Sequence, residues 1–116
     1  MSIVITDLAI TPNADVYREG ASFEIRVRLK NQSAKTDRAI LEAAIRNQSD
    51  THAPVSVRHG KVQLEATESR ELMLYDETID QRFFTDAYTV AVGLVNQFGA
   101  GSQATLTFKV QTSQVL

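Results

Sequence analysis

The chain contains neither cysteine nor tryptophan, and aromatic residues make up only 7 % of it. Without thiols, a disulfide framework, a thiolate metal site and a cysteine nucleophile are all excluded. Few aromatic rings also leave little of the flat surface on which sugar-binding sites depend. These absences exclude the small disulfide-bonded folds and count against a carbohydrate-binding module.

Net charge and long apolar runs are scarce as well. The 12 Lys and Arg residues nearly balance the 14 Asp and Glu residues, for a formal net charge of −2. Such a balance gives no positive field that would attract nucleic acid or anionic lipid. No run of about 18 apolar residues occurs, so no direct membrane insertion is predicted. We expect the partner to be another protein or a second copy of the chain.

The length of 116 residues predicts a single domain, residues 1–116, whose core is large enough to fold without a metal or a disulfide. Residues 1–7 lack the basic segment followed by an apolar segment that marks a signal peptide. Two compartments stay open. A native start at Met1 predicts a cytoplasmic protein, whereas an excised domain is expected at the cell surface or in the secreted fraction.

The strongest pattern is a pair of alternating segments, residues 87–95 and 103–110, separated by a segment rich in glycine and asparagine. Apolar residues at every second position are what one buried face of a sheet requires. Glycine and asparagine permit the positive φ of a chain reversal. We predict a β-hairpin with a connecting loop at residues 96–102.

Other segments predict further short strands. Residues 22–30 alternate apolar with charged side chains, which is typical of a strand with one buried and one solvated face. Residues 38–46 fit either a strand or a capped helix, and we favour the strand because the sheet needs a partner there. The remaining predictions are strands at 3–10, 55–58, 61–65 and 70–75, a tight turn at His59 and Gly60, and a second turn at 66–69.

Two loops are expected to be held by buried side chains. Residues 13–20 are polar apart from Val16 and Tyr17, and we expect the tyrosine to pack on the core. Residues 76–86 form an acidic loop whose apolar members, among them Phe83, should anchor it. With roughly seven or eight short strands, frequent turn signals and no firm helix, the sequence predicts an all-β fold, an immunoglobulin-like β-sandwich of antiparallel strands.

Several segments resemble known families of immunoglobulin-like sandwich domains. Residues 6–12, together with residues 20–32, are similar to the first strands of the cell-adhesion-related bacterial domain family known as CARDB, and residues 64–70 resemble the turn before its fifth strand. Residues 87–102 resemble the last two strands of fibronectin type III domains, including a tyrosine, Tyr88, early in the penultimate strand. The tryptophan usual in fibronectin type III domains is missing, and no Arg-Gly-Asp triplet occurs. The resemblance implies a non-enzymatic module, often found in tandem in bacterial surface or secreted proteins.

No pattern of catalytic residues is present. The two histidines, His52 and His59, lack the spacing of a zinc site and are expected in exposed loops. No Gly-x-Ser-x-Gly elbow and no glycine-rich phosphate loop before a helix occurs. We therefore predict that the chain is not an enzyme and has no cofactor.

The acidic residues of the 76–86 loop have the oxygen chemistry that calcium prefers. They are Asp76, Glu77, Asp80 and Asp86, and their spacing does not match an EF-hand. Whether this loop binds calcium is left open by the sequence. Aromatic residues among the acids favour a loop pinned by packing.

A candidate interaction face lies on the outward side of the predicted hairpin. Ala91, Gly93 and Val95 carry no charge, and a glycine in mid-strand is typical of a place where another surface approaches closely. Phe98, in the connecting loop, either forms an exposed anchor at that end of the sandwich or packs against it. We expect this face to mediate association, with itself or with a neighbouring domain.

The first functional hypothesis is thus a non-catalytic structural or protein-interaction module, part of a larger assembly or of a multidomain surface protein. A carbohydrate-binding module on the same fold is the second. The third is a cytoplasmic inhibitor or regulator that offers loops or an edge strand to a protein partner.

Overall fold

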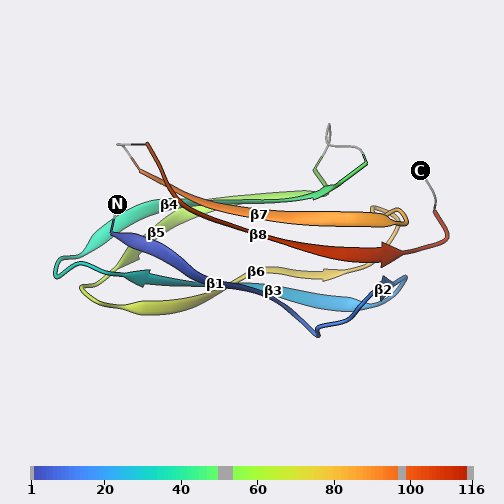
Figure 1. Ribbon diagram of the computed structural model, residues 1–116, viewed down its shortest axis with the longest axis horizontal. Coiled ribbons are helices and arrows are strands. Elements are labelled where there is room, and N and C mark those ends of the chain that lie inside the picture. The colour runs from blue at the N-terminus through green and yellow to red at the C-terminus, as the bar shows by residue number, and fades with distance from the viewer. Residues whose placement is uncertain (1, 50–53, 97–98, 115–116) are drawn as a thin grey trace.

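The computed structural model describes residues 2–49, 54–96 and 99–114, and within these ranges the chain is all-β (Figure 1). Eight strands form two stacked sheets, which confirms the predicted immunoglobulin-like sandwich. The small sheet has the order β1-β3-β6 and the large sheet the order β2-β8-β7-β4-β5. The strands are β1 (Ile3–Thr11), β2 (Tyr17–Arg18), β3 (Ser22–Asn31), β4 (Asp37–Asn47), β5 (Ser56–Leu64), β6 (Ser69–Thr78), β7 (Asp86–Asn96) and β8 (Gly99–Gln111).

The pairing of β5 distinguishes this sandwich from the antibody constant type. In that type the strand after the third long strand joins the sheet of the first strand. Here β5 pairs antiparallel with β4 and so extends the large sheet. As a result β5 and β6 are both edge strands, each with an open side.

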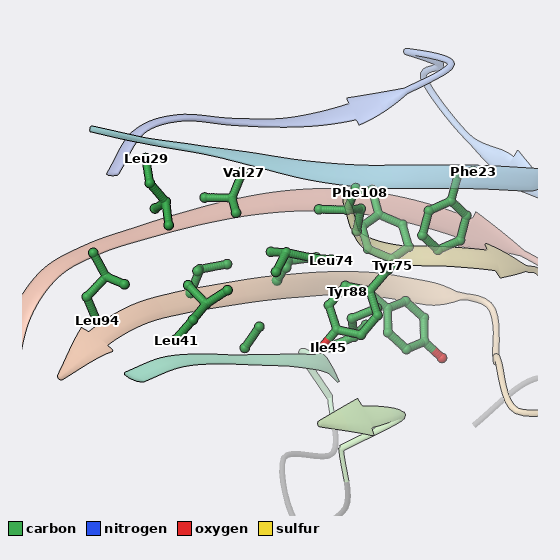
Figure 2. Packing of buried hydrophobic residues seen from close by; sticks show 14 of the residues in the cluster. Phe23, Val27, Leu29, Leu41, Ile45, Leu74, Tyr75, Tyr88, Leu94 and Phe108 are labelled. Carbon is green, nitrogen blue, oxygen red and sulfur yellow. The ribbon is translucent and has the colours of Figure 1, made fainter. Parts of the chain in front are cut away.

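The core lies between the facing rows of the two sheets (Figure 2). Its centre is a group of aromatic rings from strands far apart in the sequence. Phe23 and Phe108 have ring centroids 5.2 Å apart, and Tyr88 stacks on Phe108 at 5.7 Å. Tyr17 is buried in the same group, as its position in a polar segment predicts. Such ring pairs add stabilisation beyond the area that they bury.

Residues 38–46 form a strand, as favoured above. Alternate side chains of β4 are buried, beginning with Ala39 and Leu41, while Ile40 and Glu42 face solvent. Pairing with β5 on one side and β7 on the other outweighs the helix propensity of alanine, leucine and glutamate.

The tight turn predicted at His59 and Gly60 is wrong. Both residues lie in the middle of a continuous β5, where His59 pairs with Glu42 and Gly60 with Leu41. Gly60 does not adopt a positive φ, unlike Gly20. The glycine therefore interrupts the side-chain pattern without reversing the chain, because β4 is long enough to pair along all of β5.

The acidic segment is also shorter as a loop than predicted. Strand β6 continues to Thr78, so Asp76 and Glu77 belong to the sheet. A register shift in β6 opposite β3 lets the adjacent side chains of Leu74 and Tyr75 both point into the core, which a regular strand does not allow. Phe83, fully buried, anchors the true loop as expected.

The connection predicted at residues 96–102 is largely strand. Asn96 pairs with Gly99 and Val95 with Ala100, and a register shift after Gly93 accommodates the extra residues of β8. Phe98 lies outside the described residues. The β3–β4 connection and the β7–β8 hairpin end lie at the same end of the sandwich, as strand order predicts (Figure 1).

Candidate interaction surface

The solvent-facing side of the large sheet, called the outer face below, brings apolar side chains from three strands together. Strand register places Val95 of β7 beside Ile40 of β4. Two rows further along the sheet, Ala91 lies beside Ala44, which in turn lies beside Val57 of β5. Ile40 is 41 % exposed and Val57 is 59 % exposed. Apolar side chains of this size that stay in water across neighbouring strands mark a surface suited to contact.

Gly93 sits between these two rows and keeps the centre of the outer face flat. A Cβ atom there would meet only the Gln103 side chain, whose Cγ would be 3.7 Å away. The residue has no positive φ. The fold itself therefore does not require glycine at this position, and a glycine in mid-strand leaves room for a second surface to approach closely.

An open hollow of about 840 Å³ lies at the end of the outer face nearest the β7–β8 hairpin. Ile40 and Val95 contribute its apolar side, while its polar lining includes Arg38, Lys61, Gln63 and the acidic Asp37. Arg38 Nε donates a hydrogen bond to Gln63 Oε1 at 2.9 Å, which holds the guanidinium along the rim. An apolar floor with a polar rim is the usual anatomy of a docking surface.

The charge on the outer face differs from that of the whole chain. The outward positions of its four long strands hold the cations Arg38, Arg46, Lys61 and Lys109, against one carboxylate, that of Glu42. The outer face is therefore cationic, although the whole chain has a formal net charge of −2.

The small sheet carries ion pairs among its surface charges. The outward side chains of β3 meet acidic neighbours, with Arg26 to Glu24 at 3.0 Å and Arg28 to Glu71 at 3.1 Å. The charges of Arg26 and Arg28 are therefore compensated within the sheet.

Three of the four residues predicted for an interaction face, Ala91, Gly93 and Val95, lie together on the outer face. The fourth, Phe98, lies outside the described residues. The prediction missed Ile40 and Val57, the most exposed apolar side chains of the surface. If residues 38–46 form a strand with Leu41 facing inward, Ile40 must face outward. The sequence did not indicate this outward position clearly, because the same residues also fit a helix.

Three of the four acidic residues considered for calcium, Glu77, Asp80 and Asp86, are engaged by other groups. Asp80 Oδ1 accepts from Arg82 Nε at 2.9 Å, and Glu77 Oε2 accepts from Arg82 Nη2 at 2.8 Å. The Arg82 side chain holds the pKa of Asp80 below its usual range. Asp86 accepts from the Ser49 backbone N–H at 3.1 Å. Among the described residues no group of His, Asp and Glu is arranged to hold a metal ion.

Neither a catalytic group nor a membrane segment emerges from the described part of the chain. His59 lies exposed on the outer face with no zinc-binding partners, and His52 is outside the described ranges. No helix of sufficient length and hydropathy to span a membrane is found there.

No protein-family model matches the chain, and no curated protein matches it. Solved structures match in fold. A glycosyl hydrolase family 2 member from Bacteroides cellulosilyticus aligns over 93 % of this chain and 15 % of its own, with 18 % identity and a TM-score of 0.70. A β-glucuronidase from Bacteroides uniformis aligns over 92 % of this chain and 12 % of its own, with 16 % identity and a TM-score of 0.60.

The sporulation control protein Spo0M from Bacillus subtilis aligns over 96 % of this chain and 50 % of its own, with 14 % identity and a TM-score of 0.62. At such identities the likeness shows the sandwich fold alone. The chain spans only a small fraction of the two hydrolases and half of Spo0M.

Proposed function

We propose that the chain is a non-catalytic protein-interaction module that docks onto another protein through the outer face. The observation that carries this proposal is the missing side chain at Gly93, which leaves a flat place between two apolar pairs, Val95 with Ile40 on one side and Ala91 with Ala44 on the other. Small side chains let a second surface approach closely, and the exposed isoleucine and valine supply apolar area to bury.

Charge favours a different protein over a second copy as the partner. If two outer faces met each other, Arg38 and Lys61 of each copy would add to one positive field, and like charges across an interface oppose association. A partner with a small apolar projection ringed by carboxylates would complement both the hollow and its rim. The module would then orient that partner through electrostatic complementarity.

The setting of the proposal is a larger assembly or a multidomain surface protein. The hydrolases that match in fold are much longer chains of which the aligned region is 12 to 15 %. The resemblance of residues 6–12 to CARDB domains and of residues 87–102 to fibronectin type III domains supports the same accessory role. Sugar binding has less support, because the described aromatic side chains are all buried except the half-buried Phe84.

The test compares variants in which a glutamate is introduced either on the outer face or on the opposite sheet. Val95→Glu and Ile40→Glu alter the outer face, and Ala9→Glu adds the same group to an exposed position of β1 on the opposite sheet. Proteins captured from the source organism with each variant are identified, and a purified candidate is titrated by calorimetry. We expect the two outer-face variants to weaken binding at least about tenfold and Ala9→Glu to leave it within about twofold.

Two results would sink the proposal. One is a partner that binds all of these variants equally well, since the outer face would then be irrelevant. The other is a parent chain that forms dimers by light scattering which Val95→Glu dissociates, because the face would then serve self-association.

A further inference from the structure

The two lateral edges of the sandwich differ. On one side β1 and β8 close the edge, and the Ile5 backbone N–H donates to Ser102 Oγ at 3.0 Å across the two sheets. On the opposite side β5 and β6 are not hydrogen-bonded to each other, although both end their sheets. This open side leaves the main-chain groups of two strands available to an added strand.

A groove of about 590 Å³ runs along the open side between β5 and β6. Leu41, Leu72 and Leu74 are among the apolar side chains that line it. Gly60 faces it from β5, and no atom lies within 4 Å of where a Cβ would stand. The space over Gly60 is therefore open to a side chain from a ligand, since a glycine within a strand often marks a close approach.

The groove carries uncompensated positive charge. Arg58 faces it two residues before Gly60, and its guanidinium carbon lies 5.3 Å from the centroid of the Tyr75 ring. No carboxylate of the described residues pairs with Arg58. Lys61 and His59 project from the same strand on its other side. An acidic ligand is thus favoured over an apolar or basic one.

We propose that the open side of the sandwich binds an extended acidic peptide from a protein partner, which adds a strand to the free side of β5. Side chains two apart on a strand share one face. The added strand can therefore place an aliphatic side chain over Gly60 and, two residues away, a carboxylate at Arg58. This site adjoins the outer face, with which it shares Lys61, but the proposal does not depend on the function proposed for that face.

The charges of β5 also argue against a second copy as the occupant. Two β5 strands paired edge to edge would bring Arg58 and Lys61 of both copies close together, and like charges protect a sheet edge from such pairing. A peptide that carries carboxylates reverses this effect. The same residues that prevent aggregation thereby select the ligand.

The test uses a fluorescein-labelled peptide that repeats threonine-valine-threonine-glutamate over about nine residues, which favours an extended chain. Binding to the full chain is followed by anisotropy, and the site is mapped by amide chemical shifts. A second peptide replaces glutamate with lysine, and a third replaces each threonine with proline, which removes main-chain donors. We expect saturable binding of the first peptide, shifts confined to β5 and β6, and at least about tenfold weaker binding of the other two.

Two variants make the test specific. Gly60→Val fills the groove and Arg58→Glu reverses its charge, and each should weaken binding at least about tenfold. Gly93→Val makes the same substitution on the outer face. It should leave peptide binding unaltered and lower the affinity of the chain for the partner proposed for the outer face. Circular dichroism confirms that each variant folds.

Three outcomes would overturn the proposal. They are no anisotropy change up to about 1 mM peptide, equal binding of the proline peptide, and unaltered binding to folded Gly60→Val. A dimer of the chain that Arg58→Glu alone dissociates would also overturn it, since the occupant would be a second copy.

Discussion

The backbone N–H of Phe84 donates a hydrogen bond to the phenolic oxygen of Tyr88 at 2.8 Å. Tyr88 lies near the start of β7 and is fully buried. The bond ties the loop after β6 to the penultimate strand, and such a tyrosine corner is a hallmark of immunoglobulin-like sandwiches. The early tyrosine on which the resemblance to fibronectin type III domains rests therefore has a direct structural role.

Tyr75 provides a natural contrast, because it is equally buried but its hydroxyl has no hydrogen bond of good geometry. Burial raises the pKa of both phenols. We predict that Tyr88→Phe lowers the free energy of unfolding by about 1–3 kcal/mol, since it leaves the Phe84 N–H unpaired. Tyr75→Phe should be neutral or stabilising by up to about 1 kcal/mol. Urea unfolding of both variants checks this, and equal losses would contradict it.

A buried amide fixes one end of the sandwich. Asn31 is fully buried, and its Nδ2 donates to the carbonyl oxygens of Lys35 at 2.8 Å and Glu65 at 3.0 Å. We expect Asn31→Ala to cost about 2–4 kcal/mol of unfolding free energy, because several backbone groups lose their partner at once.

The control for that variant is its neighbour. Gln32 has an exposed side chain, so Gln32→Ala should change stability by no more than about 0.5 kcal/mol. Thermal unfolding of the pair measures both values. A loss at Gln32 as large as the loss at Asn31 would show that the β3–β4 connection matters through its backbone rather than through the amide.

The ion pair of Asp80 with Arg82 predicts a specific pH dependence. The pKa of Asp80 is lowered from its ordinary value of 3.8, chiefly by the Arg82 side chain and next by the Arg82 backbone N–H. A group with a lowered folded-state pKa stabilises the fold above its unfolded pKa, and this contribution is lost as the pH falls through the folded pKa.

We therefore expect Asp80→Asn to lower the unfolding free energy at neutral pH by about 0.5 kcal/mol, a small value because the pair is partly exposed. Near about pH 2 the two proteins should be equally stable. Urea unfolding at a series of pH values tests this, with Gln81→Ala, at an exposed position, as control. A difference that persists unchanged into acid would mean that the pair contributes nothing through charge.

Side-chain alternation was sufficient to predict the two sheets but not their finer pairing. The strands β3, β7 and β8 have regular alternation, and Tyr17 stood out as apolar within a polar segment. The adjacent inward side chains of Leu74 and Tyr75 depend on a register shift against β3, which only the folded sheet reveals. Two side chains of the outer face, Ile40 and Val57, were not predicted to lie there, because register with Val95 and Ala44 brings them together.

The two glycines Gly20 and Gly60 each follow a polar residue in the sequence, but their backbone conformations differ. Gly20 has a φ of 87°, a conformation that other residues adopt only with strain, whereas Gly60 lies in the regular strand β5. We predict that Gly20→Ala costs about 1 kcal/mol of unfolding free energy. Gly60→Ala should instead stabilise the chain by about 0.4–1 kcal/mol, because it restricts the unfolded state and its methyl group meets no atom within 4 Å. Equilibrium unfolding of the two variants decides the matter, since a tight turn at Gly60 would make both substitutions destabilising.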